Sequence, residues 1–359
     1  MINLSSIDVT NKNLVIRVDM NVPLKNGNIL DATRIEACLP TIDYALKNNA
    51  NILLISHLGR PTEGNFEEKF SLMPVANHLS KIIKKSCELI DTPNSDTIFN
   101  SNCQVQLLEN IRFFHGEKTN SDELGYQLAN LGDVYVFDAF GTAHREQAST
   151  HSAIKQSKVA CAGLLLEKEN NFLGKVLDNY ENPYLAVIGG AKVSTKLELI
   201  KHINNVAENI IVGGGIANTF ICAAGYQVGK SLIEDSMIDF AKEILNEGKI
   251  LLPKKVITSD SFEGSNVKEK SIADIEDHEM ILDLKIENET HTIINSAKTI
   301  LWNGPMGVFE NELFEDGTKT LSQAISNSSA FSIAGGGETL SAINKYINLD
   351  DVSYCSTGG

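Results

Sequence analysis

The chain has 359 residues, 42% hydrophobic and 21% charged, which is typical of a soluble globular protein with room for two domains. Its formal net charge of −15 argues against a general nucleic-acid-binding protein, because such proteins carry a basic surface. No stretch approaches the roughly 18 consecutive apolar residues of a membrane span. Residues 1–13 lack the basic and apolar regions of a signal peptide. We therefore expect a cytoplasmic protein.

Strand-like apolar runs alternate with helix-like periods through most of the chain. Residues 14–16 predict a strand, and the spacing of Ile35, Leu39, Ile42 and Leu46 places them on one face of a helix. Further strands are predicted at 52–55, 105–108, 134–137, 184–188, 209–212, 255–258, 299–302 and 330–333, with a helix at about 72–85. This alternation predicts parallel sheets joined by crossover helices.

Residues 163–183 have an apolar stripe and end at Pro183, so we interpret them as a connecting helix. The predicted organisation is a first domain at 1–162, a connector at 163–183 and a second domain at 184–359. Six cysteines are scattered without a C-x-x-C pair, which favours reduced thiols and argues against a zinc site.

Polar and basic residues follow the predicted strands of the first domain. These residues are Asp19, Asn21, Arg34, His57, Arg60, Arg112, His144 and Arg145. "SHLGRP" at 56–61 alone could be a helix cap or a surface turn. However, ligands bind at the carboxyl ends of parallel strands, and convergent arginines recognise carboxylate or phosphate. The pattern favours a small acidic, phosphorylated substrate.

Glycines follow the predicted strands of the second domain, in "VIGGAKVSTK", "IIVGGGIANTF", "SIAGGGETLSAI" and the terminal "STGG". Glycine lets the backbone approach a phosphate, and the next helix offers free N–H groups. Tight turns and close packing also use glycine, but four such turns favour nucleotide phosphates. The candidate binding residues are Gly190, Ala191, Lys192, Lys196, Gly214, Gly336, Gly337 and Thr339.

Two named motifs fail on spacing. "GGGIAN" does not complete G-x-G-x-x-G, which disfavours a dehydrogenase on the same kind of sheet. "GYQVGKS" at 225–231 resembles a P-loop, but three residues rather than four separate Gly225 from Gly229. We interpret this segment as a loop that follows a helix.

"LWNGPMGVFE" at 301–310 forms a Pro- and Gly-rich turn after the only tryptophan. Trp302 could be a core residue, or the turn could be a nucleotide wall from which Asn303 and Glu310 reach the sugar or the phosphates. Pro305 and Gly307 are further candidate binding residues in this turn. Glu338, at a predicted helix start, is the candidate carboxylate for a magnesium–nucleotide complex. It could equally complement the helix dipole.

Together these segments resemble the phosphoglycerate kinase family. "RVDMNVPL", "SHLGRP", "ENIRF", "DAFGTAHR", "GGAKVSTK", "WNGPMGVFE" and "STGG" are similar to its signature segments, occur in its order and cover nearly the whole chain. The resemblance implies two Rossmann-like three-layer α/β domains with parallel sheets, joined by a helical hinge. It also implies an enzyme that transfers phosphate between ATP and 3-phospho-D-glycerate, giving ADP and 1,3-bisphosphoglycerate (EC 2.7.2.3), with Mg²⁺ bound to the nucleotide. The sequence does not give the oligomeric state, and a monomer is our default expectation.

The resemblance also suggests residue roles. Asp19, Asn21, His57, Arg60, Arg112 and Arg145 would bind the acid substrate, and Arg34 and Lys192 would meet the transferring phosphoryl group. His144 is assigned to substrate binding from its place after a predicted strand. We expect both histidines to bind and orient substrate rather than to form a phosphohistidine. The family usually has Asp at the position of Glu338. It also continues past "STGG" with a C-terminal segment, whereas this sequence stops at Gly359. If the protein itself ends there, a catalytically silent nucleotide-binding protein of the same fold is the alternative.

Overall fold

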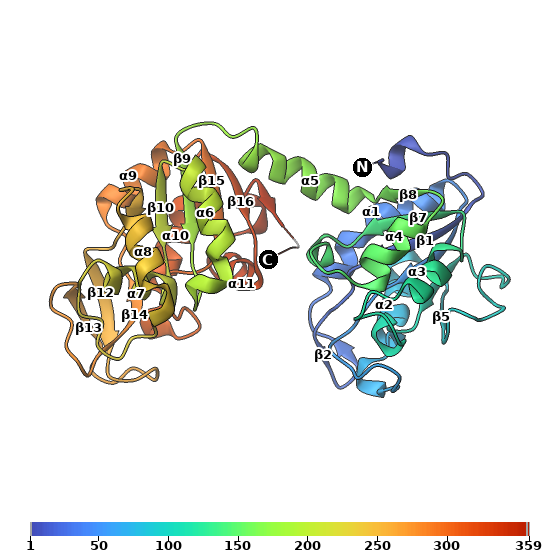
Figure 1. Cartoon of the computed structure of the whole chain (residues 1–359), viewed down its shortest axis with the longest axis horizontal. Helices are drawn as coiled ribbons and strands as arrows, with labels where there is room; N and C mark the ends of the chain where they lie inside the picture. Colours follow the sequence, from blue (N-terminus) through green and yellow to red (C-terminus); the bar gives the residue numbers. More distant parts are fainter. Residues whose placement is uncertain (1, 357, 359) are drawn as a thin grey trace. The chain divides into compact units, whose positions relative to one another are not determined.

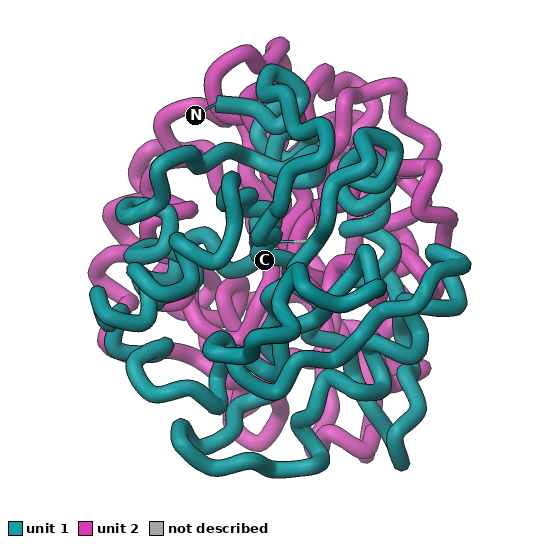
Figure 2. The backbone as a smooth tube through the Cα atoms, turned by 90° about the vertical axis from the view of Figure 1, so that its right-hand side faces the viewer, with its two compact units in different colours: residues 1–171, 358 teal, residues 172–357, 359 magenta. Residues whose placement is uncertain are grey.

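The computed structural model describes residues 2–356 and 358 and divides the chain between Asn171 and Phe172 into two compact units. Figure 2 colours the first unit teal and the second magenta. Each unit is built around its own six-stranded sheet in which every pair of neighbouring strands is parallel (Figure 1). The predicted fold class is therefore confirmed.

The sheet of the first unit has the strand order β5-β6-β4-β1-β7-β8. Its strands are β1 (Asn13–Val18), β4 (Asn51–Ile55), β5 (Cys87–Ile90), β6 (Val105–Leu108), β7 (Val134–Asp138) and β8 (Ala160–Ala162). Its helices are α1 (Thr33–Lys47), α2 (Met73–Ile83), α3 (Asp122–Ala129) and α4 (Ala153–Gln156), and β2 (Leu24–Lys25) pairs with β3 (Asn28–Ile29) in a separate hairpin.

Helices cover both faces of this sheet. On one face, Ile16 of β1 belongs to a buried cluster with Ile35 of α1 and Leu79 of α2. On the other face, Val15 belongs to a cluster with Leu128 of α3. Successive residues of a strand point to opposite faces, so a strand covered on both sides reads as one continuous apolar run. This is why β1 and β4 could be recognised in the sequence.

Helix α5 (Leu164–Leu177) contains the division between the units. It ends six residues earlier than the predicted connector at 163–183, and Tyr184 begins the next strand. Proline disfavours helical geometry in the residue before it, so Pro183 is preceded by irregular chain. At the start of α5, the amides of Leu164 and Leu166 donate to Thr41 Oγ1 and Asp138 Oδ1, each at 2.9 Å.

The sheet of the second unit has the strand order β11-β10-β9-β15-β16-β17. Its strands are β9 (Tyr184–Ile188), β10 (Asn209–Val212), β11 (Ile250–Leu251), β15 (Thr299–Asn303), β16 (Phe331–Ala334) and β17 (Tyr354–Cys355). Its helices are α6 (Leu197–Val206), α7 (Gly214–Ala223), α8 (Ile238–Leu245), α9 (Asn288–Ser296), α10 (Asp316–Ser326) and α11 (Gly337–Tyr346).

One predicted parallel strand is instead antiparallel. β12 (Lys255–Ser259) lies between β13 (Lys268–Ser271) and β14 (Met280–Leu284) in a separate three-stranded sheet. No crossover helix lies between β12 and β13, and the short connection lets the chain turn back on itself. The prediction that 255–258 continues the parallel sheet was therefore wrong, although the strand itself is present.

Two further findings concern the chain as a whole. All six cysteines are free thiols. In residues 2–356, the structure has no helix that is both long enough and apolar enough to cross a bilayer.

Candidate active site

The four strands that precede the predicted anion-binding residues are neighbours in the first sheet, in the order β6-β4-β1-β7. Arg112 follows β6, His57 and Arg60 follow β4, Asp19 and Asn21 follow β1, and His144 and Arg145 follow β7. Because the strands are parallel, their carboxyl ends lie along one edge of the sheet. The structure therefore brings these residues to one edge of the sheet.

Asp19 and Asn21 organise the end of β1. Arg34, the second residue of α1, donates from Nη1 to Asp19 Oδ2 at 3.1 Å, and its side chain remains 41% exposed. The amide of Asn21 donates to Asp19 Oδ1 at 3.1 Å, and Asn21 Oδ1 accepts from the amide of Gly59 at 2.9 Å. These contacts tie the β1 loop to both α1 and the β4 loop.

Arg17 is a member of this site that the sequence reasoning missed. It lies in β1, is completely buried, and donates from Nε to Ser149 Oγ at 2.9 Å. Ser149 in turn donates from Oγ to buried Glu117 Oε1 at 2.6 Å, and its amide donates to Glu117 Oε2 at 2.9 Å. The sequence feature that could have identified Arg17 is its position as a charged residue inside an otherwise apolar strand.

His57 is nearly fully buried among guanidinium groups. Burial lowers its pKa most, and the positive charges of Arg17, Arg112, Arg145 and Arg34 lower it further. Asp19 Oδ1 lies 3.9 Å from His57 Nδ1, but the imidazole is neutral, so this contact is not an ion pair. His57 therefore contributes hydrogen bonds and no net charge.

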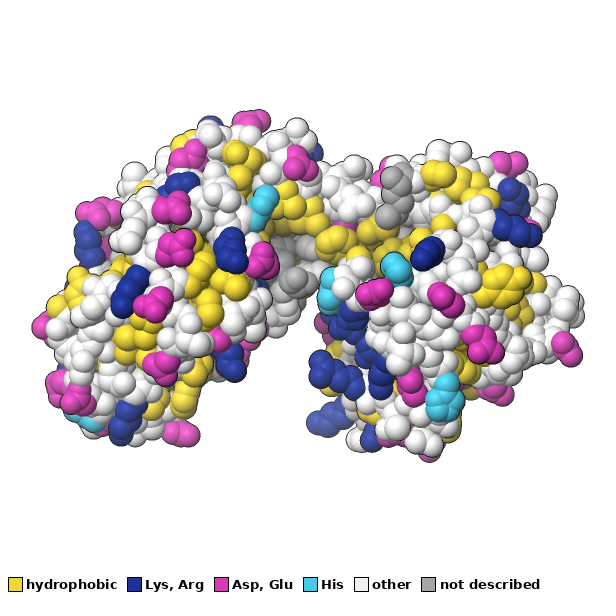
Figure 3. Space-filling model, in the orientation of Figure 1, with side chains coloured by type: hydrophobic (Ala, Val, Ile, Leu, Met, Phe, Trp, Pro, Cys, Tyr) yellow, Lys and Arg dark blue, Asp and Glu magenta, His cyan; other side chains and the backbone are white. Residues whose placement is uncertain are grey.

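Arg17, Arg34, Arg60, Arg112 and Arg145 form what we call the arginine cluster. Figure 3 shows dark-blue side chains gathered on one part of the first unit, the body on the right. Burial, together with the charges of Arg145, Arg17 and Arg60, lowers the pKa of Arg112 to about 10. Guanidinium groups held close together against their mutual repulsion form a site suited to a multiply charged anion.

The predicted residues in this unit differ in how firmly they are held. Arg112 is buried and donates from Nη1 to the carbonyl of Gly59. Arg60 and His144 are exposed, and among the described residues the side chains of Arg60, His144 and Arg145 make no hydrogen bond or ion pair. Arg112 therefore shapes the site, whereas the side chains of Arg60, His144 and Arg145 are available to a ligand.

In the second unit, glycines at three strand ends are required by packing. A Cβ on Gly189 or Gly213 would lie 2.2 Å from the carbonyl oxygen of Pro305, and one on Gly304 would lie 2.4 Å from that of Gly189. The turn after β15 therefore packs directly on the turns after β9 and β10. Gly337, the first residue of α11, has nothing within 4 Å of such a Cβ, so its backbone is open to a ligand.

A polar network joins the ends of β15 and β16. Lys196 donates from Nζ to Asn303 Oδ1, and Asn303 Nδ2 donates to the carbonyl of Gly335 at 2.9 Å. Thr339 Oγ1 accepts from the amide of Gly304 at 2.8 Å and donates to the carbonyl of Gly335 at 2.8 Å. Burial lowers the pKa of Lys196, and the nearby charge of Glu338 opposes that change.

A pocket of about 380 Å³ lies beside this network. Seven of the predicted nucleotide-binding residues line it: Gly190, Ala191, Gly214, Pro305, Gly307, Glu310 and Glu338. The others, Lys192, Lys196, Asn303, Gly336, Gly337 and Thr339, do not line it. Lys192 is exposed and immediately precedes the short 3₁₀ helix Val193–Lys196, which leads into α6.

The apolar side of the pocket was not predicted. It consists of Leu232, Phe262, Met280, Ile281, Leu282, Leu284, Met306 and Val308, and Lys230 and Asp283 also line the pocket. No motif marks these residues, which come from the separate antiparallel sheet and from loops. A base binds between apolar surfaces, so this side gives the pocket the character of a nucleotide site.

Trp302 is a core residue, which was one of its two interpretations from the sequence. It is completely buried in β15, and its Nε1 donates to the carbonyl of Gly304 at 3.0 Å. The terminal "STGG" segment is only partly described, because Thr357 and Gly359 lie outside the described residues.

A sequence model of the phosphoglycerate kinase family matches residues 4–359 of this chain. The chain belongs to that family. It is 48% identical to a phosphoglycerate kinase from a Psychrobacter species, over 98% of this chain and 92% of the relative. It is also 46% identical to the phosphoglycerate kinase of Vibrio campbellii, over 100% of this chain and 94% of the relative.

Solved phosphoglycerate kinase structures share the fold. The enzyme from Coxiella burnetii aligns with a TM-score of 0.90 at 43% identity, and that from Pyrococcus horikoshii with 0.84 at 30%. Both alignments cover 100% of this chain and 94% of the solved chain. The activity of the chain is accordingly that of a phosphoglycerate kinase, a glycolytic phosphotransferase.

Proposed function

We propose that the chain transfers a phosphoryl group directly between ATP and 3-phospho-D-glycerate, with the acid substrate bound by the first unit and the nucleotide by the second. The arginine cluster carries this proposal. 3-Phosphoglycerate has a carboxylate and a phosphate, and guanidinium groups bind both bidentately. The side chains of Arg60, His144 and Arg145 make no hydrogen bond or ion pair within the described residues and can contact the substrate.

The nucleotide would occupy the pocket of the second unit. Its base would pack on the apolar side, and its phosphates would lie at the glycine turns after β9, β10 and β16. The α11 N-terminus and the open backbone at Gly337 suit a phosphate, because free N–H groups and the helix dipole favour negative charge. Lys196 would add a positive charge at the same strand ends.

Glu338 fits the role of a carboxylate for magnesium. It lies on the pocket, is exposed, and makes no hydrogen bond or ion pair among the residues that the structure describes. Magnesium prefers oxygen ligands and is commonly held by one or two carboxylates together with substrate phosphates. When bound, the ion would neutralise phosphate charge. The chain itself contributes the amides, Lys196 and Glu338.

The chemical step needs positioning and positive charge rather than a protein nucleophile. Arg34 and Lys192 would stabilise the charge on the moving phosphoryl group. His57 is a poor nucleophile for a phosphoenzyme, because its Nδ1 lies 3.3 Å from Nη2 of Arg17 and it is buried among arginines. Exclusion of water during transfer would protect the acyl phosphate from hydrolysis. We further propose a monomeric, cytoplasmic enzyme.

Incubation with γ-³²P-labelled ATP without 3-phosphoglycerate tests direct transfer. After a quench in base, which preserves phosphohistidine, the protein should carry no label. After addition of 3-phosphoglycerate, the label should appear in the small-molecule product alone. Stoichiometric label on the protein, absent from a His57→Gln variant, would contradict direct transfer.

A further inference from the structure

Lys230 is a charged residue on the nucleotide pocket for which the reaction described above has no use. It belongs to "GYQVGKS", which resembles a P-loop but has the wrong spacing. The same pocket is also lined by Leu232, Phe262 and Met280, which are apolar. Within the described residues, no hydrogen bond or ion pair uses its ammonium group, so this donor is available to a ligand.

The loop that carries Lys230 is firmly held. Gly229 has φ +53°, and a Cβ there would lie 2.3 Å from the carbonyl oxygen of Glu279. The amide of Lys230 donates to that same carbonyl at 2.7 Å, and the amide of Ile281 donates to Ser231 Oγ at 2.8 Å. Lys230 is therefore presented to the pocket by a backbone that is fixed on both sides.

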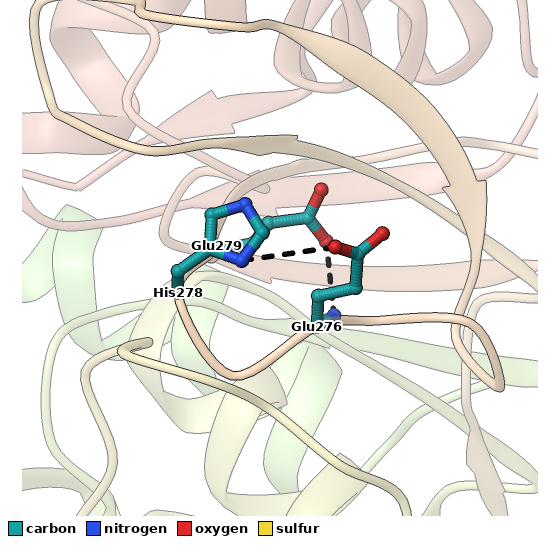
Figure 4. Close-up of side chains that lie close together, drawn as sticks. All are labelled: Glu276, His278 and Glu279. Atoms are coloured by element: carbon teal, nitrogen blue, oxygen red, sulfur yellow. Dashed lines mark hydrogen bonds and ion pairs between the residues drawn. The ribbon is translucent and has the colours of Figure 1, made fainter.

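The segment that accepts the hydrogen bond from the Lys230 amide, at 276–279, is itself held by ion pairs. Figure 4 shows Glu276, His278 and Glu279 close together in the turn before β14. Lys270 Nζ lies 2.6 Å from Glu276 Oε1 and 2.8 Å from buried Glu279 Oε1. The Lys270 ammonium group thus forms ion pairs with both carboxylates, and the cluster supports the loop.

The backbone of Lys230 is tied to a different sheet from the one that carries the phosphate-binding turns. Those turns follow β9, β10 and β16 of the large sheet, whereas Lys230 is attached to the chain just before β14 of the small sheet. The apolar residues around Lys230 suit a base. A base edge offers ring nitrogen and carbonyl acceptors, and an ammonium group has three N–H donors and no acceptor.

We propose that Lys230 binds the nucleotide by donating a hydrogen bond from its ammonium group to an acceptor on the edge of the base. This inference rests on the proposed binding of nucleotide by the second unit. It makes Lys230 a binding residue for the base, in contrast to Lys196, which serves the phosphates.

Calorimetric titration of the full chain with ADP and with tripolyphosphate, which has no base, tests this assignment. Lys230→Met should weaken ADP binding by about tenfold, the value expected for a lost hydrogen bond to a charged group. It should leave tripolyphosphate affinity unchanged. Lys230→Arg keeps the donor and should retain most of the ADP affinity. Lys201→Met removes the same charge from the exposed face of α6 and should match the wild type for both ligands.

Three outcomes would overturn the assignment. Unchanged ADP affinity in Lys230→Met would show that the base does not use this donor. An equal loss for ADP and tripolyphosphate would place Lys230 at the phosphates or make its effect a general electrostatic one. A wild-type chain that binds no ADP would remove the proposed nucleotide site as well, whereas the first two outcomes leave that site intact.

Discussion

Nη2 of Arg17 lies 3.3 Å from Nδ1 of His57, and both side chains are buried. An arginine always donates, so Nδ1 of the imidazole accepts and Nε2 carries the proton. Burial and the surrounding arginines lower the pKa of His57, which keeps the ring neutral. In the proposed substrate site, the arginine cluster would supply the charge for an anionic substrate, and His57 would supply an oriented N–H donor.

This relationship predicts the pH dependence of stability. In the unfolded chain His57 gains a proton below about pH 6.5, whereas in the folded chain it stays neutral. The stability contribution of neutral His57 is therefore present above about pH 6.5 and is lost as the pH falls, by about 1.4 kcal/mol per pH unit. The Tm of the wild type should therefore fall relative to that of His57→Gln when the pH is lowered from 7.5 to 5.5. A constant difference would contradict a neutral His57.

Arg34→Ala should lower kcat far more than it raises either KM. Arg34 is half-exposed at the start of α1 and contacts Asp19, so its charge is available to the phosphoryl group in the transition state. Arg34→Lys keeps a charge but loses the bidentate geometry, so its kcat should lie between those of the wild type and Arg34→Ala. Steady-state kinetics with each substrate varied in turn decide this point. An unchanged kcat with a raised KM for 3-phosphoglycerate would make Arg34 a simple binding residue.

Two substitutions should separate the two ligand sites. Lys196→Ala removes a charge at the ends of β15 and β16 and should weaken ADP binding while leaving 3-phosphoglycerate binding nearly intact. Arg60→Ala removes an exposed guanidinium of the first unit and should do the reverse. Calorimetric titration of each ligand into each variant measures both effects. Loss of the same ligand in both variants would refute the assignment of the units.

Asp283 should make the second unit less stable as the pH rises toward neutrality. Its Oδ2 accepts from the amide of Gly317 at 2.7 Å in α10, but burial raises its pKa to about 7. The unfolded carboxyl ionises near pH 4, so the folded chain holds more protons between about pH 4 and 7 and stability falls across that window.

Asp283→Asn keeps an acceptor for Gly317 and removes this titration. The Tm of the variant relative to wild type should therefore increase between pH 5 and 7.5. Asp239→Asn, at an exposed position on α8, is the matched control and should show no such trend. A parallel pH dependence of wild type and Asp283→Asn would contradict the raised pKa of Asp283.

Motifs at strand ends could be predicted from the sequence because parallel strands bring their carboxyl ends to one edge. This applies to Asp19, His57 and Arg112, and to the glycine turns at Gly190 and Gly214. Arg17 was missed because its side chain lies within a strand and acts through Ser149 and His57, contacts that span up to 132 residues of sequence.

The apolar side of the nucleotide pocket was harder to predict. Phe262 and Leu282 are ordinary apolar residues, and only the antiparallel pairing of β12 with β14 brings them to the pocket. The same pairing explains the error at β12, since a short apolar run reads alike in parallel and antiparallel sheets. Lys230 belongs to a segment whose glycine spacing excludes a P-loop. That exclusion does not show whether Lys230 binds a ligand in another way.

A coupled assay for 1,3-bisphosphoglycerate formation, with ATP and 3-phosphoglycerate supplied to the full chain, tests the central claim most directly. The account predicts turnover that requires both substrates, saturates with each, and falls strongly in Arg34→Ala. Nucleotide binding by calorimetry without any turnover would contradict it and would leave a silent nucleotide-binding protein of the same fold.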